Sequence, residues 1–336
     1  MKILIDSPKF YPSVGGLETV ISILAHEFVS LGHEVKLISK VSSTDSKYFP
    51  FEVIRQPNPQ KILELTSWCN IFFQGCVSLK NLWTLLIVHR PLAISHQTWY
   101  RRPNGSYSWQ DYIKQNVTNF ASNISVSSAV AEHIAGKSVI IPNPYKEDIF
   151  YRIPKSCRDK ELIYLGRLVS DKGVDLLLDA LANLKTIGMS PRLTIVGSGP
   201  EESNIRQKTI DLGLIDQVEF TGVKFEHELA KLLNSHQIMV VPSRWKEPFG
   251  VVALEGIACG CVVIGSEEGG LKEAIGPCGV TFPNGDVQAL TNRIIELLTN
   301  PEKLESCMSH ADTHLSIHKK EKIARAYLQT FERAIR

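Results

Sequence analysis

The chain of 336 residues lacks the features that define several classes of protein. Its longest apolar stretch without a charge lies near Leu82–Val88, far below the ~18 residues that a membrane-spanning helix needs. With 37 Lys and Arg against 35 Asp and Glu, the net charge is only +2, which argues against a nucleic-acid-binding protein. If the protein works at a membrane, we expect it to do so from the surface.

Motifs for metal or redox chemistry are also scarce. The seven cysteines form no CxxC pair, and no His/Cys cluster has the spacing of a zinc site. Cys259 and Cys261 lie in an apolar run, where thiols act as small hydrophobes. Lys2 is followed only by a short apolar segment that ends at Asp6, so we expect no signal peptide. These features predict a reduced, cytoplasmic protein without a metal or cofactor. The alternative location is peripheral, at the inner face of the membrane.

Two passages of the chain begin in the same way, with a strand, a glycine loop and a helix. The first comprises residues 2–7, Gly15-Gly16, a helix over 17–31 and a strand over 35–39; the second comprises a strand over 161–166, a helix over 174–187 and a strand over 192–197. Strands that alternate with helices indicate parallel sheets covered on both faces. The sequence therefore predicts an α/β protein with two doubly wound domains.

The prolines and mixed charges of residues 142–156 interrupt this pattern and predict the domain boundary. We expect a first domain over 1–145, a linker over 146–157 and a second domain over 158–318. After Asn300 the pattern is helical to the end of the chain.

The most informative segment of the second domain is 240–275. A strand over 238–241 runs into Pro242–Gly250, and a helix that carries Glu255 begins near Gly250. Ligands of open α/β sheets bind beyond the carboxyl ends of the strands. The free backbone amides at the start of a helix suit a phosphate, and here those amides belong to Phe249, Gly250 and Val251. Glu247 and Glu255 bracket the helix start and suit sugar or ribose hydroxyls. Alternatively, Glu247 caps the helix and Glu255 faces water.

A second loop at the same edge of the sheet carries two cations. Gly166 ends a strand, and Arg167 and Lys172 follow it. Arginine binds phosphate in a bidentate way and lysine adds a point charge, so the pair suits a diphosphate; two solvated surface cations are the alternative. The turn Gly197-Ser198-Gly199-Pro200 resembles the start of a dinucleotide fingerprint, but Glu202 stands in place of its third glycine. A dehydrogenase is therefore a weaker interpretation, because Gly15-Gly16 misses the same spacing.

Together these residues resemble the retaining GT-B glycosyltransferases of family 4. The motifs Gly-Arg-x4-Lys-Gly, Gly-x-Gly-Pro, Phe-Thr-Gly and Glu-x7-Glu occur in the order of that family between residues 161 and 285. The resemblance implies the GT-B fold, in which two Rossmann-like domains face each other across a cleft that closes around the substrates. It implies transfer of a sugar from a nucleotide diphosphate with retention of configuration. The C-terminal helix, about 319–336, would return to the first domain.

The resemblance also assigns roles to single residues. Arg167 and Lys172 would hold the donor diphosphate, Glu247 the hydroxyls of the transferred sugar and Glu255 the ribose. The other residues that would bind the donor are Gly15, Gly16, Gly197, Gly199, Pro200, Gly222, Val223, Pro248, Phe249, Gly250 and Val251. His96, in Leu92–His96, fits the histidine that the family has near the sugar, and His89 competes for this place. Its job would be to orient a sugar hydroxyl through its ring or its backbone.

An aromatic and basic segment after His96 predicts a surface for the acceptor. Trp99, Tyr100, Arg101 and Arg102 combine rings that stack on sugars with cations that attract phosphate, so we expect a growing glycan or its lipid carrier there; a solvated loop with buried rings is the alternative. Tyr107 and Trp109 follow in the same segment.

The donor and the reaction are expectations from the same resemblance. The chain has no Asp-x-Asp triplet, the carboxylate pair that holds a divalent metal in the other large class of nucleotide-sugar transferases, so we expect metal-independent transfer. UDP-glucose is the expected donor, and polysaccharide or glycolipid assembly the expected pathway. Two alternatives share the fold: a nucleotide-sugar 2-epimerase and a non-catalytic subunit that binds a nucleotide sugar.

Overall fold

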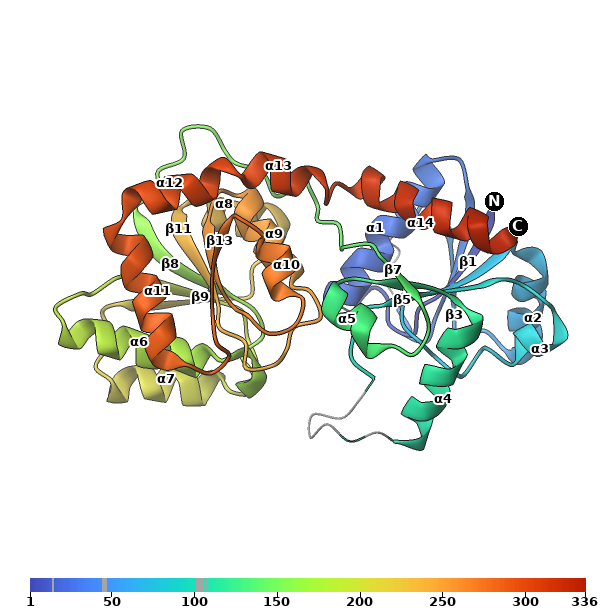
Figure 1. Ribbon diagram of the computed structural model, residues 1–336, viewed down its shortest axis with the longest axis horizontal. Coiled ribbons are helices and arrows are strands. Elements are labelled where there is room, and N and C mark those ends of the chain that lie inside the picture. Colours follow the sequence, from blue (N-terminus) through green and yellow to red (C-terminus); the bar gives the residue numbers. More distant parts are fainter. Residues whose placement is uncertain (14, 44–46, 101–105, 107) are drawn as a thin grey trace. The chain divides into compact units, whose positions relative to one another are not determined.

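The computed structural model describes residues 1–13, 15–43, 47–100, 106 and 108–336, and it divides the chain into two compact units (Figure 1). Unit 1 comprises Met1–Pro144 and His318–Arg336, and unit 2 comprises Tyr145–Ile317. Residues 146–157, which were predicted as the linker, contain no helix or strand. They form part of unit 2, where Tyr145 and Phe150 are buried.

Unit 1 is built on a seven-stranded parallel sheet with the order β3-β2-β1-β4-β5-β6-β7. Its strands are β1 (Lys2–Asp6), β2 (Glu34–Ser39), β3 (Glu52–Arg55), β4 (Ile71–Gln74), β5 (Leu92–His96), β6 (Ser122–Ser125) and β7 (Ser138–Ile140). Its helices are α1 (Gly16–Ser30), α2 (Pro59–Trp68), α3 (Thr84–Ile87), α4 (Trp109–Val117), α5 (Ser128–His133) and α14 (Lys320–Ile335).

The last helix of the chain completes the core of unit 1. α14 packs beside α1 and against the sheet, where the ring of Phe331 lies 5.6 Å from Phe28 and 5.1 Å from Phe73. The hydroxyl groups of Tyr327 and Ser95 are 2.9 Å apart. Apolar residues of α2, among them Ile62 and Leu65, instead pack with Leu4 and Phe72 of β1 and β4. Both faces of the sheet are therefore covered, as its strongly apolar strands require.

Unit 2 repeats this plan with six parallel strands in the order β10-β9-β8-β11-β12-β13. These strands are β8 (Lys160–Leu165), β9 (Leu193–Val196), β10 (Val218–Gly222), β11 (His236–Val241), β12 (Val262–Ser266) and β13 (Gly279–Phe282). The helices are α6 (Val174–Thr186), α7 (Glu202–Asp211), α8 (Glu226–Asn234), α9 (Val251–Ala258), α10 (Leu271–Ile275), α11 (Val287–Thr299), α12 (Pro301–Ser309) and α13 (Ala311–Ser316). Ser170–Lys172 forms a single 3₁₀ turn.

The two units share one topology. In each unit, the first three strands follow one another toward one edge of the sheet, and the later strands follow one another toward the other edge. The strand order therefore reverses between β1 and β4 in unit 1 and between β8 and β11 in unit 2. Such a reversal leaves a crevice beyond the carboxyl ends of the two strands, where open α/β sheets bind ligands. The predicted pair of doubly wound α/β domains is confirmed.

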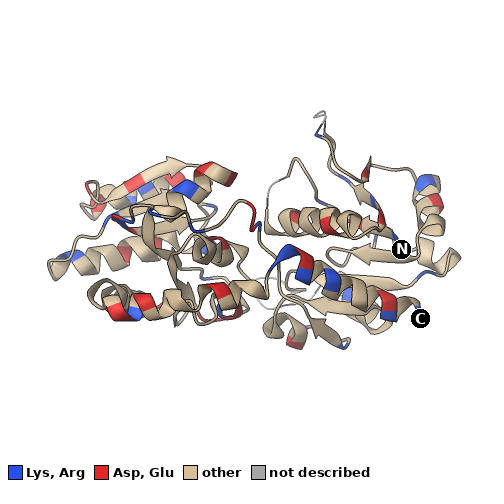
Figure 2. Cartoon of the chain, turned by 90° about the horizontal axis from the view of Figure 1, so that it is seen from above, with Lys and Arg blue, Asp and Glu red and all other residues tan. Residues whose placement is uncertain are grey.

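Both units of the molecule carry charges of both signs. Acidic and basic residues both occur on the helices of each unit (Figure 2), in agreement with the small net charge. Within the described ranges, no helix is long and apolar enough to cross a membrane.

Candidate functional site

The reversal between β8 and β11 brings two predicted residues into direct contact. Lys172 lies on the loop after β8 and Glu247 on the loop after β11, and the Nζ atom of Lys172 is 2.5 Å from Oε1 of Glu247. Both side chains are mostly buried, with 24% and 13% of their surface exposed. A cation and a carboxylate thus meet at the point where the topology predicts a ligand.

Hydrogen bonds from three loops hold Glu247 and the loop that carries it. Ser243 donates a hydrogen bond of 2.7 Å to its Oε1 atom, and the backbone carbonyl of Glu247 accepts one of 2.7 Å from the amide of Gly270. Gly269 has a positive φ of 86°, and a Cβ atom there would clash with the Glu247 carbonyl. Asn284 donates to the carbonyl of Ser243, so the loop that carries Glu247 is fixed before any ligand binds.

The loop of Lys172 is anchored to the same place. The carbonyl of Asp171 accepts hydrogen bonds from the amides of Arg244 and Trp245, and Arg244 forms a bidentate ion pair with Asp175, both contacts being 2.6 Å. Although partial burial opposes it, this pair lowers the pKa of the Asp175 carboxyl. The loops after β8 and β11 are therefore clamped together on either side of the Lys172–Glu247 pair.

Arg167 lies on the first part of the β8 loop. Its side chain is exposed, and no ion-pair partner for it occurs among the residues that the structure describes. Its backbone is fixed, because the hydroxyl of Tyr164 donates a hydrogen bond of 2.9 Å to the Arg167 carbonyl. The guanidinium is thus presented to solvent from a rigid base.

The glycine turns after β9 and β10 pack against this loop. Gly197 has a φ of 136°, and a Cβ atom there would overlap the carbonyl of Gly166; one at Gly199 would overlap that of Leu168. The amide of Gly197 donates a hydrogen bond of 2.9 Å to the carbonyl of Gly222. The structure thus brings the turn Gly197–Pro200 and the turn at Gly222 and the exposed Val223 side by side.

The start of α9 supplies the predicted group of amides. Gly250 precedes the helix with a φ of 111°, a backbone conformation that favours glycine, and the ring of Phe249 is buried beneath it. Pro248 stands between Phe249 and Glu247, and Val251 is the first helical residue. The amide end of α9 therefore follows Glu247 directly and can face an anion.

Glu255 lies on the second turn of α9 and is largely surrounded by protein. Burial raises the pKa of its carboxyl to about 7, and Lys146 opposes this shift. The carboxyl therefore takes up a proton near neutral pH. Neither water nor an ion pair stabilises its charge fully, a property common at ligand sites.

In unit 1, the structure distinguishes the two candidate histidines. His89 is exposed and precedes β5, whereas His96 is the last residue of β5. The ring of His96 is fully buried: its Nε2 atom donates to Oδ1 of Asn123 at 2.9 Å, and its Nδ1 atom accepts from the hydroxyl of Tyr100 at 2.6 Å. Burial lowers the pKa of this imidazole to about 4, so the ring is neutral and both nitrogens are occupied.

The predicted acceptor segment is only partly a surface. Tyr100 is buried and its hydroxyl bonds to His96, so this side chain is not part of an exposed surface. Trp99 is half-buried, with its ring edge-on to His133 at 5.3 Å. Arg101, Arg102 and Tyr107 lie outside the described residues.

At the reversal between β1 and β4 in unit 1, amide side chains surround a buried carboxylate. Asp6, the last residue of β1, is buried, and its two carboxylate oxygens accept hydrogen bonds from Gln74 at 3.0 Å and Asn81 at 2.9 Å. Burial raises the pKa of Asp6 despite these bonds. Gly15 and Gly16 stand at the start of α1, where Gly15 adopts an extended backbone.

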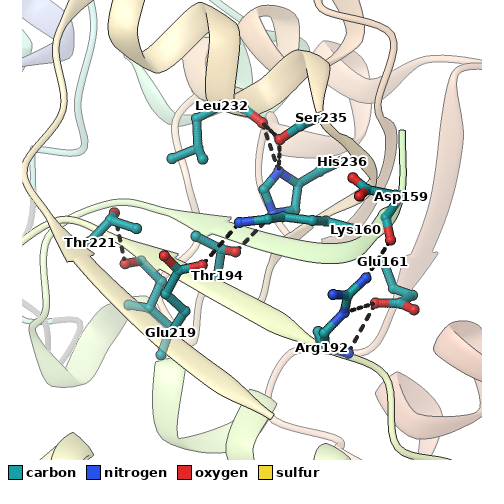
Figure 3. A network of polar contacts seen from close by, with 11 residues as sticks. Asp159, Lys160, Glu161, Arg192, Thr194, Glu219, Thr221, Leu232, Ser235 and His236 are labelled. Carbon is teal, nitrogen blue, oxygen red and sulfur yellow. Dashed lines mark hydrogen bonds and ion pairs between the residues drawn. The ribbon is translucent and has the colours of Figure 1, made fainter. Parts of the chain in front are cut away.

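A polar groove of about 530 Å³ lies elsewhere in unit 2, between the edge strand β10 and α8. Figure 3 shows the network beneath it, in which the buried His236 bonds to Thr194 at 2.8 Å and Lys160 pairs with Glu219 at 3.0 Å. Lys224, on its rim, also pairs with Glu228. These charges neutralise one another, so the groove carries no chemistry comparable to that of the Lys172–Glu247 site. In the described part of the chain, no cluster of His, Cys, Asp or Glu could hold a metal ion.

Comparison with solved structures defines the class of fold. The chain is similar to a sucrose-phosphate synthase from Thermosynechococcus elongatus, with a TM-score of 0.81 and 20% identity over 99% of this chain and 98% of the other. It is also similar to Anabaena HepE in complex with UDP, with a TM-score of 0.84 and 20% identity over 99% and 100%. The fold is that of the GT-B glycosyltransferases.

Comparison of sequences then defines the family. The family model described as glycosyl transferases group 1 matches residues 146–314, half of the chain, and the chain belongs to this family of glycosyltransferases. One relative is a GDP-mannose-dependent α-(1-6)-phosphatidylinositol dimannoside mannosyltransferase from Mycobacterium tuberculosis, which is 26% identical over 89% of this chain and 88% of its own length. A glycogen synthase from the same species is 35% identical over 42% of this chain and 34% of its own length.

Several residues of the site have no clear signal in the sequence. Asn284 reaches the Glu247 loop from beyond β13, and the Arg244–Asp175 pair joins residues 69 positions apart. Ser243 precedes Glu247 by only four positions on the same loop. Of these supporting residues, it is the one whose closeness to the carboxylate could be predicted from the sequence.

Proposed function

We propose that the protein transfers a hexose from a nucleotide diphosphate sugar to an acceptor hydroxyl, with retention of configuration and without a metal ion. The observation that carries this proposal is the contact between Lys172 and Glu247 at the reversal of the unit 2 sheet, with the exposed Arg167 on the same loop as Lys172. Cations and helix-end amides suit a diphosphate, and a fixed carboxylate suits the hydroxyls of a sugar.

Each group has a role in this proposal. Arg167, Lys172 and the amides of Phe249, Gly250 and Val251 hold the diphosphate. Glu247 accepts hydrogen bonds from the transferred sugar, and Glu255 from the ribose. The base lies against the glycine turns, which contain Gly197, Gly199, Pro200, Gly222 and Val223. His96 contributes through its backbone, because its ring nitrogens are occupied by Tyr100 and Asn123.

The reaction exchanges one bond at the anomeric carbon for another. The bond from that carbon to the β-phosphate oxygen breaks, and a bond to the acceptor oxygen forms on the same face of the sugar. The proton of the acceptor hydroxyl passes to the departing phosphate oxygen. Arg167 and Lys172 stabilise the negative charge that gathers on the diphosphate, an effect worth about 3–4 kcal/mol for a well-placed group.

For the donor, UDP-glucose is the first candidate and GDP-mannose the second. UDP and UDP-glucose occupy the structurally similar HepE, whereas a relative that aligns with 89% of this chain is described as GDP-mannose-dependent. The acceptor in our proposal is a growing glycan or a lipid-linked one, and the protein reaches it from the cytoplasmic surface of the membrane.

Thermal melting with a set of nucleotides tests the donor site. We expect UDP to raise the melting temperature more than GDP or ADP, and the rise to disappear in Arg167→Ala. A ligand at a hundred times its Kd stabilises the folded state by about 2.7 kcal/mol. A larger shift with GDP would select the mannose donor, and no shift with any nucleotide would contradict the proposal.

Incubation with the donor alone separates the alternatives that share the fold. A transferase leaves the sugar of the donor unchanged until an acceptor is added, whereas a 2-epimerase inverts C2 without one. A protein that binds the donor but transfers nothing to any added glycan or lipid-linked acceptor would be a non-catalytic subunit. NMR of the donor sugar distinguishes these outcomes, and NMR of the product's anomeric carbon tests retention.

A further inference from the structure

The hydroxyl of Ser243 is a buried group whose one polar partner, in the described part of the chain, belongs to the candidate site. Ser243 is 1% exposed and donates a hydrogen bond of 2.7 Å to Oε1 of Glu247. Most side-chain hydrogen bonds in proteins go to backbone groups or to water. A buried hydroxyl that bonds instead to a candidate ligand-binding carboxylate indicates a role in the site.

The backbone of Ser243 is fixed by side chains from the ends of two neighbouring strands. Its carbonyl accepts hydrogen bonds from the hydroxyl of Ser266 at 2.7 Å and from Nδ2 of Asn284 at 3.2 Å. Ser266 is the buried last residue of β12. Asn284 lies just beyond β13, and its Oδ1 atom accepts from the amide of Glu268 at 3.0 Å. The ends of β11, β12 and β13 together determine where the Ser243 hydroxyl lies.

The two donors to the Glu247 carboxylate bind the same oxygen. Lys172 lies 2.5 Å and Ser243 2.7 Å from Oε1, and no donor among the described residues is bonded to Oε2. Two donors from different loops fix the carboxylate more firmly than one, because the last torsion of a glutamate side chain is otherwise broad. Oε2 is therefore the oxygen that remains to accept from a ligand hydroxyl.

Lys172 alone would not fix this orientation. An ammonium group is a compact charge with three rotatable donors, so it attracts either carboxylate oxygen or both together. In the proposed function Lys172 also faces the donor diphosphate, whereas the hydroxyl of Ser243 has a single hydrogen to donate. The orientation of the carboxylate thus depends on Ser243 rather than on the cation.

We propose that Ser243 is a positioning residue, which holds Oε1 of Glu247 so that Oε2 binds a hydroxyl of the transferred sugar. This inference rests on the proposed function and deepens it, because it names a residue on which recognition of the sugar depends. The proposed diphosphate contacts of Arg167, Lys172 and the α9 amides do not involve Ser243. Its loss should therefore weaken binding of a sugar nucleotide but not of the free nucleoside diphosphate.

Calorimetric titration of the full chain with UDP and with UDP-glucose tests this separation, and GDP with GDP-mannose forms the second pair. We expect Ser243→Ala to raise the Kd for the sugar nucleotide about tenfold, the scale of one hydrogen bond to a charged group, and to change the Kd for the nucleoside diphosphate by less than about twofold. Ser243→Thr, which keeps the hydroxyl, should restore most of the affinity for the sugar nucleotide.

Thr194→Val is the matched control for a purely structural loss. Thr194 carries another buried hydroxyl of unit 2, which bonds to His236 at 2.8 Å, so this variant should lose stability as Ser243→Ala does but keep both affinities. Thermal melting of each variant without ligand measures that loss.

The possible outcomes separate this inference from the proposed function. Equal weakening of UDP and UDP-glucose binding by Ser243→Ala, no weakening of either, or failure of a folded Ser243→Thr chain to regain affinity would each overturn the role of Ser243 alone. An unmodified chain that binds neither the nucleotides nor the sugar nucleotides would contradict the proposed function itself, and the role of Ser243 would fall with it.

Discussion

The two sheets reverse their strand order in the same way, yet the two reversals hold different chemistry. In unit 2, Lys172 and Glu247 meet in a mostly buried ion pair, and the exposed Arg167 lies on the same loop as Lys172. In unit 1, Asp6 lies at the equivalent point but is enclosed by the side-chain amides of Gln74 and Asn81. One reversal presents charges to a ligand, and the other satisfies its charge internally.

This difference shows that the strand order determines where a ligand site can form, whereas the side chains at that position determine whether a ligand can bind. A crevice beyond β1 and β4 exists in unit 1 as it does beyond β8 and β11 in unit 2. The function of each crevice depends on whether its charged side chains are already satisfied by partners within the protein. We therefore expect substitutions at the reversal in unit 2 to affect ligand binding and those at the reversal in unit 1 to affect folding.

The largest expected effect is on turnover. Lys172→Ala removes a cation from the proposed diphosphate site, and we expect kcat with the preferred sugar nucleotide to fall by about 10²–10³, or roughly 3–4 kcal/mol. The free energy of unfolding should fall by about 1–3 kcal/mol, because the mostly buried Glu247 carboxylate then loses its cation and keeps the hydrogen bond from Ser243. Lys208→Ala, which removes a comparable ion pair with Asp179, is the control, and equal turnover in the two variants would argue against the site.

The converse experiment concerns the unit 1 reversal. Asp6→Ala leaves the buried amides of Gln74 and Asn81 without their acceptor, and we expect the free energy of unfolding to fall by about 2–3 kcal/mol. The affinity for UDP should remain that of the unmodified chain, because the proposed nucleotide site belongs to unit 2. Urea denaturation and calorimetric titration measure the two quantities. A loss of UDP affinity without loss of stability would remove the contrast between the units.

A smaller effect is expected from pH. The pKa of Glu255 is about 7 in the folded protein against an ordinary value of 4.5, so the folded state binds a proton more tightly than the unfolded state. Its contribution to stability is present below pH 4.5 and is lost as the pH rises to about 7. We expect the stability difference between the unmodified chain and Glu255→Gln to fall by about 1–3 kcal/mol across this window. Denaturation curves at pH 4.5, 6 and 8 check this, and a flat difference would contradict it.

The smallest effect should come from Tyr100. Tyr100→Phe leaves the Nδ1 atom of the buried His96 without its donor, and we expect a loss of about 1–2 kcal/mol in the free energy of unfolding. Acceptor KM should stay unchanged, because the tyrosine hydroxyl points to His96 and not to solvent. Tyr48→Phe, at a tyrosine of unit 1 that is 85% exposed, is the matched control and should leave stability unaltered. An increase in acceptor KM for Tyr100→Phe would restore its predicted place on the acceptor surface.

Much of the fold could be predicted because its signals are local. The helix expected over 17–31 is α1 at Gly16–Ser30, and the strand expected over 161–166 is β8 at Lys160–Leu165. Apolar periodicity and glycine positions are properties of a few neighbouring residues. The meeting of Lys172 and Glu247 could also be anticipated, because both loops follow strands whose carboxyl ends share one edge.

What the sequence could not reveal depends on contacts between distant segments. Tyr100 appeared as part of an aromatic and basic surface, but the structure turns its hydroxyl toward His96 and buries it. Asn284 supports Ser243 across 41 positions, and no local pattern marks that bond. The exposure of Trp109, Tyr112 and Phe120 on and just after α4 could not be predicted either, because their spacing alone describes an apolar face turned to a core.

The position of α14 has a consequence for the order in which the molecule is made. Unit 1 begins with Met1 but is complete only when His318–Arg336 has left the ribosome, after every residue of unit 2. Until then the rings of Phe28 and Phe73 lack the cover that Phe331 provides. Unit 2 is thus the first part of the chain that can finish folding during synthesis, and the first domain in the sequence is the last to close.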